Sequence, residues 1–149
     1  TFGPRQTARA VIPTIASQLL SKCDELRLGA LDPTRDFVYV TDTAAALMAL
    51  AVCPEADGKV VNIGSGREWS IEETARLLMD ITGHDCPIRS DDARLRPDAS
   101  EVQRLLADAS RLRGLTGWAP LVDFPEGLRR TAAWIAENLD RFDPGHYAR

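Results

Sequence analysis

Two arginine-containing segments carry the residue types best suited to hold an anionic group. Arg35, with Asp36 beside it, follows a proline-containing turn and precedes an apolar run. Arg94 and Arg96 lie together in a polar segment much further along the chain. A guanidinium group forms paired hydrogen bonds with phosphate oxygens, so two arginines from separate loops could clamp a diphosphate. A single arginine is usually a solvated surface charge, and the hypothesis therefore depends on the two segments meeting in the fold.

Other patterns that could carry chemistry are incomplete. The Gly-Ser-Gly run at 64–66 has the start of a dinucleotide-binding loop, but Trp69 stands where that motif needs its third glycine. Glycines in a turn between strand and helix also have a structural explanation, because they adopt positive φ freely. One class of dehydrogenases pairs a catalytic Tyr with a Lys four residues later. The residue four positions after Tyr39 is Thr43, so this pair is missing there. The sequence therefore predicts no catalytic residue and no cofactor-binding residue in this chain.

Composition and charge narrow the classes of partner. The chain has 149 residues, of which 44% are hydrophobic and 27% charged, as expected for one globular domain. Its formal net charge is −4, whereas nucleic acids and anionic membranes attract basic surfaces. No apolar run approaches the roughly 18 residues that a membrane span requires. We expect neither a nucleic acid nor a membrane as partner.

The cysteines and histidines show no metal-binding spacing. Cys23, Cys53 and Cys86 are far apart, no CxxC occurs, and the histidines are His84 and His146. The sequence therefore predicts no zinc site, and an odd number of free thiols favours a reducing, cytoplasmic location. The chain opens without an initiator Met and without an apolar signal segment, so we interpret it as a piece of a longer protein.

Periodicity and capping signals predict a mixed α/β chain with short strands. Capping residues include Asp42, the Ser70/Glu73 capping box, Asp108 and Asp123, and Gly83 ends one helix. The stripe Ala44, Leu47, Met48 and Ala51 is expected to face the core. The predicted helices cover 13–20, 43–52, 71–82, 109–116 and 124–139, and the predicted strands cover 25–28, 36–40, 59–63 and 87–89, with a polar loop at 91–100.

The order of several motifs resembles one enzyme family. The motifs are Phe-Gly-Pro-Arg-Gln at 2–6, the run 28–40 with its Arg-Asp-Phe, Asn-Ile-Gly-Ser-Gly at 62–66, and the run from Arg96-Pro97 through Glu101-Val102 to Pro120. Together they resemble the extended short-chain dehydrogenase/reductase family of nucleotide-sugar dehydratases and epimerases. The resemblance covers nearly all of 1–149 but only the C-terminal, substrate-binding part of such enzymes. The Rossmann core and its Tyr/Lys pair would precede Thr1, and the segment 1–9, separated from that core, is expected to be the least ordered.

The resemblance assigns the two arginine segments to one substrate group. Arg35 matches the arginine of the family's Arg-Asp-aromatic motif, which contacts the substrate diphosphate. Arg96 matches the arginine of the Arg-Pro motif, which contacts the same diphosphate from the other side. Arg94, two residues before it, is expected to point elsewhere and to contribute much less to binding.

Further substrate contacts follow from the same resemblance. Glu101 matches the acidic residue near the nucleoside ribose, and Leu28 and Gly29 match the segment that lines the base pocket. Arg9 lies where relatives place a polar or basic substrate contact. The Arg-Pro-to-Glu-Val spacing is one residue longer than in typical GDP-mannose dehydratases, which leaves the identity of the base open.

The activity implied for the full-length protein is that of a nucleotide-sugar 4,6-dehydratase. In this reaction NAD oxidises the sugar at C4, water leaves across C5 and C6, and hydride returns at C6. NAD or NADP would be bound by the N-terminal portion, the full-length protein would be a homodimer, and the 149-residue chain alone would be inactive. A 4-epimerase of the same family and a non-catalytic nucleotide-binding module are the alternatives.

Overall fold

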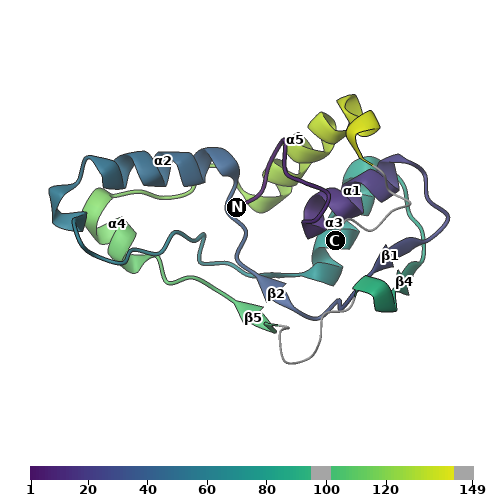
Figure 1. The fold of residues 1–149 in the computed structure, drawn as a ribbon, viewed down its shortest axis with the longest axis horizontal. Helices are drawn as coiled ribbons and strands as arrows, with labels where there is room; N and C mark the ends of the chain where they lie inside the picture. Colours follow the sequence, from purple (N-terminus) through teal and green to yellow (C-terminus); the bar gives the residue numbers. More distant parts are fainter. Residues whose placement is uncertain (95–101, 143–149) are drawn as a thin grey trace.

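Helices and short strands form an elongated molecule in the computed structural model, which describes residues 1–94 and 102–142 (Figure 1). The helices are α1 (Val11–Leu20), α2 (Val40–Ala51), α3 (Ile71–Thr82), α4 (Ser110–Thr116) and α5 (Phe124–Glu137), and the strands are β1 (Leu26–Leu28), β2 (Thr34–Arg35), β3 (Trp69–Ser70), β4 (Ile88–Ser90) and β5 (Arg104–Leu105). Single 3₁₀ turns occupy Pro54–Ala56, Asp92–Arg94 and Leu139–Arg141. Within the described ranges, no helix has the length and apolar character needed to cross a bilayer.

Three helices, α1, α3 and α5, pack against one another at one end of the molecule. Local signals define their bounds. Ser70 and Glu73 exchange side-chain and backbone hydrogen bonds at the start of α3, and Gly83 ends that helix with φ of 61°. The Asp123 carboxylate accepts a hydrogen bond from the Glu126 N–H and caps α5. The predicted capping signals of α3 and α5 are therefore confirmed. The contact between α1, α3 and α5 is filled by apolar side chains that are all 1% exposed or less, namely Ile12, Ile15, Leu19, Leu78, Leu128 and Ile135.

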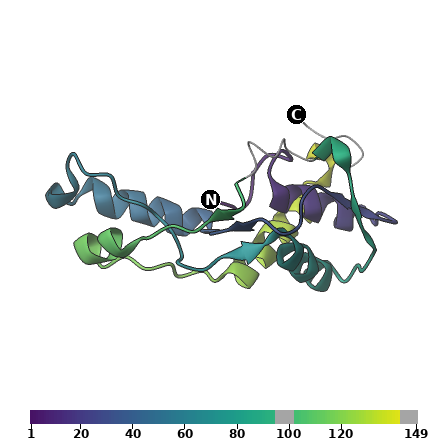
Figure 2. The same cartoon turned by 90° about the horizontal axis from the view of Figure 1, so that it is seen from below.

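The strands form two small sheets, one near the middle of the molecule (β2, β3 and β5) and one at the three-helix end (β1 and β4) (Figure 1, Figure 2). β1 and β4 pair in parallel, with Leu26 opposite Ile88 and Leu28 opposite Ser90. β2 lies between β3, which runs antiparallel to it, and β5, which runs parallel. The predicted strands at 25–28 and 87–89 are confirmed, with small changes at their ends. The parallel pairing brings the turn after α1 beside the turn after α3.

A second, smaller core lies at the other end, between α2 and α4. A buried carboxylate connects its parts, because Asp42 accepts hydrogen bonds from the Leu121 and Val122 N–H groups at 3.1 and 2.9 Å. The Trp118 indole N–H donates to the Asp42 carbonyl at 3.1 Å and thereby joins the same core. The buried members of this core are Val38, Ala46, Leu112 and Trp118.

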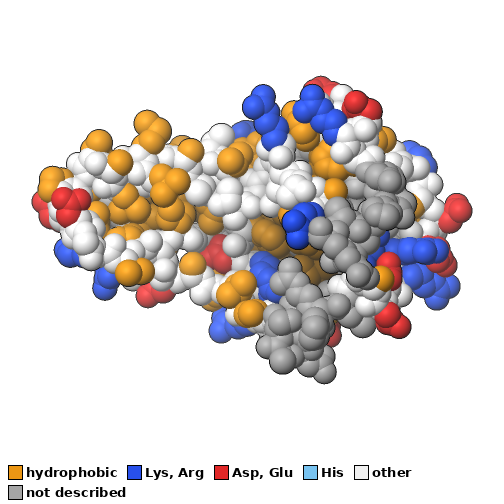
Figure 3. Space-filling view, in the orientation of Figure 1, with side chains coloured by type: hydrophobic (Ala, Val, Ile, Leu, Met, Phe, Trp, Pro, Cys, Tyr) orange, Lys and Arg blue, Asp and Glu red, His pale blue; other side chains and the backbone are white. Residues whose placement is uncertain are grey.

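The predicted core face of α2 is wrong. Leu47 and Met48 are 57% and 72% exposed, and the buried apolar residue of the helix is Ala46 instead. The reason is that α4 packs on the Ala46 side of α2 and nothing in the described residues covers the other side. Apolar side chains consequently gather on the surface of the α2 end of the molecule (Figure 3).

Two predicted strands do not form in the described residues. Residues 36–39 form no strand, and their pairing in the described residues is a single isolated bridge from Phe2 to Tyr39. Helix α2 already begins at Val40, so Asp42 lies inside its first turn and does not cap it. Among the residues that the structure describes, no strand pairs with the segment 59–63, and Val60 is 81% exposed. A strand needs a neighbour for its hydrogen bonds, and local β propensity does not provide one.

The start of the chain is better packed than expected. Phe2 is 2% exposed, and its ring contacts Phe37, Tyr39 and Phe124 with centroid distances of 5.3 to 6.0 Å. Its N–H donates to the Val38 carbonyl at 3.0 Å. The expectation that 1–9 is the least ordered segment is therefore wrong for Phe2, which belongs to the main core.

Candidate functional site

A cavity of about 200 Å³ lies where the start of α1, the end of β1, strand β2 and the turn after β4 meet. The parallel pairing of β1 and β4 places the carboxyl ends of both strands on the same side, which is where their following residues enter the cavity wall. The lining residues are Arg9, Ala10, Val11, Thr14, Leu28, Gly29, Ala30, Pro33, Arg35, Ile71 and Arg94.

The cavity brings together four of the six residues that the sequence predicted for substrate binding, namely Arg9, Leu28, Gly29 and Arg35. They come from three separate stretches of the chain. The other two predicted residues, Arg96 and Glu101, lie outside the described residues. The last described residue before them is Arg94, which lines the cavity, and the first described residue after them is Val102, whose carbonyl contacts Arg35.

Arg35 is held beside the cavity by backbone carbonyls. Its Nη1 donates to the Thr34 carbonyl at 2.8 Å and to the Val102 carbonyl at 2.7 Å. Strand β2 carries Arg35 at the centre of its three-stranded sheet. These bonds connect the guanidinium to the start of the β5 segment, so its position depends on the sheet remaining intact.

Arg94 also lines the cavity, which corrects the expectation that it points elsewhere. Its side chain is only 9% exposed, and its Nε donates to the Asp91 carboxylate at 2.9 Å. The Asp91 N–H in turn donates to the Leu28 carbonyl at 2.8 Å. Asp91 therefore folds the 3₁₀ turn back against the end of β1. The Asp-to-Arg spacing of three residues could have indicated this contact in the sequence.

The N-terminus of α1 adds positive potential to the arginines. Ala10 occupies the N-cap position and forms no side-chain cap, and Pro13 lies within the first turn. Ala10, Val11 and Thr14 all line the cavity. A helix N-terminus carries roughly half a positive charge, and its N–H groups are natural partners for anions. The cavity thus combines three arginines, a helix N-terminus and the apolar walls Leu28 and Ile71.

Glu68 supports the sheet that carries Arg35. Its carboxylate accepts hydrogen bonds from the Thr34 hydroxyl on β2 at 2.9 Å and from the Arg104 Nε on β5 at 2.8 Å. The Arg104 guanidinium, and after it the Thr34 hydroxyl, hold the pKa of Glu68 below its usual value. One side chain therefore joins two neighbouring strands of the sheet.

The Gly-Ser-Gly run at 64–66 is organised by the residue next to Arg35. The Asp36 carboxylate accepts hydrogen bonds from the Ser65 and Gly66 N–H groups at 2.8 and 3.1 Å and from the Ala107 N–H at 3.3 Å. A Cβ on Gly64 would lie 2.6 Å from the Asp36 carboxylate. Gly66 has φ of 77°. Both glycines thus have the structural role that the sequence offered as one explanation.

This arrangement does not fit a nicotinamide dinucleotide. In a dinucleotide loop the backbone N–H groups of the glycine turn bind the pyrophosphate. Here the N–H groups of Ser65 and Gly66 already donate to a carboxylate of the same chain. Trp69, at the third-glycine position, stacks on Phe124 with a centroid distance of 5.0 Å. The described residues therefore do not form a cofactor loop at this turn.

Comparison with known proteins identifies the family. The family model described as GDP-mannose 4,6 dehydratase matches residues 1–131. The chain belongs to this family. Its motifs also place it among the extended short-chain dehydrogenase/reductases, whose members modify nucleotide sugars.

The names of the curated relatives of this chain describe different reactions. A "Putative UDP-glucose 4-epimerase" of Methanocaldococcus jannaschii is 35% identical over 92% of the chain and 43% of its own length. A "GDP-6-deoxy-D-mannose reductase" of Pseudomonas aeruginosa is 35% identical over 86% of the chain and 43% of its own length. A "dTDP-glucose 4,6-dehydratase" of Actinoplanes sp. is 31% identical over 92% of the chain and 42% of its own length.

Solved structures of relatives share the fold. The structure of RMD from Pseudomonas aeruginosa, complexed with NADPH, has a TM-score of 0.82 at 31% identity over 91% of the chain. The UDP-glucose 4-epimerase of Thermotoga maritima, solved with UDP-glucose, has a TM-score of 0.79 at 28% identity over 93% of the chain. The chain spans 46% and 44% of those two chains, less than half of each.

Proposed function

We propose that this chain binds the diphosphate of a nucleotide sugar in the cavity between α1, β1 and β2, as the substrate-binding portion of an NAD-dependent nucleotide-sugar 4,6-dehydratase. The observation that carries the proposal is the joint placement of Arg9, Arg35 and Arg94 on one cavity. A nucleotide diphosphate carries about two negative charges, and guanidinium groups both neutralise and orient such a group.

The walls of the cavity suggest how the rest of the ligand is placed. Leu28 and Gly29 continue from β1 beside the arginines and offer an apolar surface for the base. The cavity volume of about 200 Å³ is below the roughly 300–1,000 Å³ of complete ligand sites. We therefore propose that the cavity holds the diphosphate and the adjoining nucleoside, with the sugar contacted by residues outside the described ranges. Arg96 and Glu101 are proposed to act there, on the diphosphate and the ribose.

The redox chemistry of the whole protein is proposed to lie outside this chain. We assign the binding of NAD or NADP to a preceding Rossmann portion, together with the groups that act on the sugar. The reason is that the N–H groups of the glycine turn at 64–66 already donate to the Asp36 carboxylate. Residues of this chain would hold and orient the nucleotide end of the substrate, while the cofactor would supply hydride transfer at the sugar.

Binding of nucleoside diphosphates to the 149-residue chain tests the site. Isothermal titration calorimetry with UDP, GDP and dTDP should show saturable binding that the corresponding nucleosides lack. Each hydrogen bond to a charged group contributes about 1.5–3 kcal/mol, so Arg35→Ala or Arg94→Ala should weaken binding by about 10- to 100-fold. Arg96→Ala is expected to act in the same direction.

Arg89→Ala is the matched control for these variants. Arg89 lies on β4, is 65% exposed and pairs with Glu25 at 3.0 Å, away from the cavity lining. Its loss should leave the affinity within about twofold, because Arg89 does not line the cavity and an exposed ion pair contributes little to the stability of the fold. Equal affinities of wild type and Arg35→Ala, or equal losses in Arg35→Ala and Arg89→Ala, would contradict the proposed site.

A 4-epimerase is the second candidate, because a relative with 35% identity carries that name. The two activities differ in their product. The whole protein, supplied with NAD and a nucleotide sugar, should yield a 4-keto-6-deoxy sugar if it is a dehydratase and a C4 epimer if it is an epimerase. Product analysis by NMR distinguishes them, and an unchanged nucleotide sugar would contradict both.

A further inference from the structure

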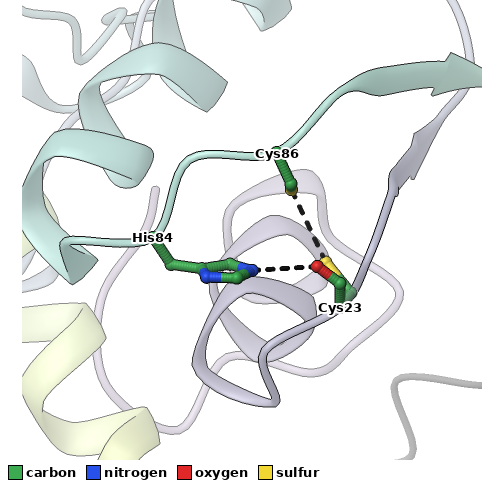
Figure 4. Close-up of side chains that lie close together, drawn as sticks. All are labelled: Cys23, His84 and Cys86. Carbon is green, nitrogen blue, oxygen red and sulfur yellow. Dashed lines mark hydrogen bonds between the residues drawn. The ribbon is translucent and has the colours of Figure 1, made fainter.

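A cluster of two cysteines and a histidine lies on the opposite end of the β1–β4 pair from the cavity. Cys23 is in the turn after α1, and His84 and Cys86 are in the turn between α3 and β4 (Figure 4). One ligand atom from each lies within 4.8 Å of the others, and all three residues are half-buried. The spacing of the cysteines and histidines along the sequence predicted no zinc site. That spacing does not show that the parallel strands bring these turns together.

The distance between the sulfur atoms fits a shared metal ion. The Sγ atoms of Cys23 and Cys86 are 3.8 Å apart. Two thiolates at about 2.3 Å from a tetrahedral zinc ion are separated by about 3.8 Å. A disulfide needs about 2.05 Å, so the two sulfurs would have to approach by roughly 1.7 Å to form one. The cluster is therefore spaced as metal ligands are.

His84 already presents a ring nitrogen on the side of Cys23. Its Nε2 is 2.8 Å from the Cys23 carbonyl oxygen, which can only accept, so Nε2 carries the proton (Figure 4). A metal ion would bind Nε2 in place of this proton, and the single proton of the neutral ring would move to Nδ1. Neutral imidazole in either tautomer is a good ligand for zinc.

The surroundings favour a cation with access to solvent. Asp24 follows Cys23 in the chain, and Asp85 lies between His84 and Cys86. Asp85 and His84 also line a shallow depression that opens to solvent.

We propose that Cys23, His84 and Cys86 bind one thiophilic dication, with Zn²⁺ the foremost candidate. On binding, the two thiols release their protons to solvent, and two thiolates and one neutral imidazole hold the ion. Three protein ligands leave the fourth tetrahedral position to water. The ion would connect the end of α1 to the start of β4, at the point where the Leu26 N–H donates to the Pro87 carbonyl at 2.9 Å.

Metal titration of the reduced 149-residue chain tests this site. Calorimetry with Zn²⁺ should show one ion bound per chain with release of protons, and Co²⁺ should give thiolate-to-metal charge-transfer absorption. Loss of a supporting residue around a metal ligand typically costs about 10- to 100-fold in affinity, so loss of a ligand itself should cost more than about 100-fold. Cys23→Ser, Cys86→Ser and His84→Ala are therefore each expected to weaken Zn²⁺ binding to that extent.

Cys53→Ser is the control, because Cys53 follows α2 and its thiol contacts the Leu115 carbonyl of α4 at 3.9 Å, away from the cluster. It should bind Zn²⁺ as the wild type does. The ¹⁵N NMR spectrum of the His84 ring gives a readout that needs no variant. The ring proton should move from Nε2 to Nδ1 when Zn²⁺ binds.

Several results would overturn the proposal. These are the absence of saturable Zn²⁺ binding to the reduced chain, the absence of thiolate absorption with Co²⁺, and a His84 ring that keeps its Nε2 proton in excess Zn²⁺. Undiminished affinity in Cys86→Ser, or lost affinity in Cys53→Ser, would do the same. Formation of a Cys23–Cys86 disulfide at the same rate with and without Zn²⁺ would also count against a bound metal.

Discussion

Replacement of Gly64 by Ala adds only one methyl group, but it should strongly destabilise the segments that support the cavity. A Cβ at this position would lie 2.5 Å from the Ala107 Cβ and 2.6 Å from the Asp36 Oδ2. The Ala107 Cβ is fixed to the backbone beside β5, so it cannot rotate away. The Gly64→Ala variant must therefore displace either the 64–66 turn or the segment that follows β5.

The expected cost follows from these contacts. Overpacking by one carbon in a well-packed region costs about 1–3 kcal/mol. The Asp36 carboxylate, displaced by the new methyl, would also lose some of its bonds to Gly66 and Ala107, which are the longest it forms at 3.1 and 3.3 Å. A lost bond to a charged group costs about 1.5–3 kcal/mol, and long bonds lie at the lower end. We expect Gly64→Ala to lower the free energy of unfolding by about 2–5 kcal/mol.

Urea unfolding followed by circular dichroism measures this loss directly. Two other glycines separate steric crowding from backbone conformation. No atom of the described ranges lies near a Cβ added to Gly114, inside α4, so Gly114→Ala should raise stability by about 0.5–1 kcal/mol. Gly66 also has no close neighbour but has φ of 77°, so Gly66→Ala should cost about 1–2 kcal/mol from strain alone.

The order of these three variants is the decisive result. Gly64→Ala should be the least stable, followed by Gly66→Ala and then Gly114→Ala. Gly64→Ala should also weaken nucleoside diphosphate binding, because Asp36 is adjacent to Arg35. A Gly64→Ala chain as stable as wild type would refute the close approach of the turn to Ala107. A loss no larger than that of Gly66→Ala would show that backbone strain, not crowding, limits this position.

Two further outcomes follow from packing and charge. Phe2→Ala removes a ring that is 2% exposed and contacts three aromatic residues, so it should lower the free energy of unfolding by about 3–5 kcal/mol. The Val40 amide donates to the Phe2 carbonyl at 2.8 Å, so its hydrogen exchange should be faster in the variant, and equal rates in the two chains would contradict this. The lowered pKa of Glu68 means that its stabilising contribution is present above the ordinary carboxyl pKa of about 4.3 and is lost as pH falls through the lower folded-state value. Wild type should therefore lose stability relative to Glu68→Gln as the pH falls below about 4.3, whereas parallel stability profiles in the two chains would refute the role of Glu68.

Local signals in this sequence predicted local structure well. The Ser70/Glu73 capping box and the Asp123 cap each lie within one helical turn of the groups that they bind, so the start of α3 and α5 could be read directly. Strands 36–40 and 59–63 were wrong because a strand depends on a neighbour elsewhere in the chain. The exposed side of α2 could not be foreseen, since periodicity shows a stripe but not what covers it.

The candidate site shows the same limit. The resemblance to nucleotide-sugar enzymes named Arg9, Leu28, Gly29 and Arg35, and the fold places all four on one cavity. Arg94 was missed because its position depends on Asp91 folding back onto the end of β1. Nothing in the spacing of the cysteines indicated their meeting, because that meeting depends on the register of two parallel strands.

Arg35 and Asp36 are neighbours in one extended segment, and they serve opposite sides of it. Arg35 lines the cavity, while Asp36 holds the N–H groups of Ser65 and Gly66. A ligand that immobilises the first side chain also steadies the backbone that carries the second. The Ser65 and Gly66 amides, which face away from the ligand, would then exchange their hydrogens more slowly when the cavity is filled. The glycine turn would thus serve as a natural reporter of occupancy, readable in the unmodified chain without a label.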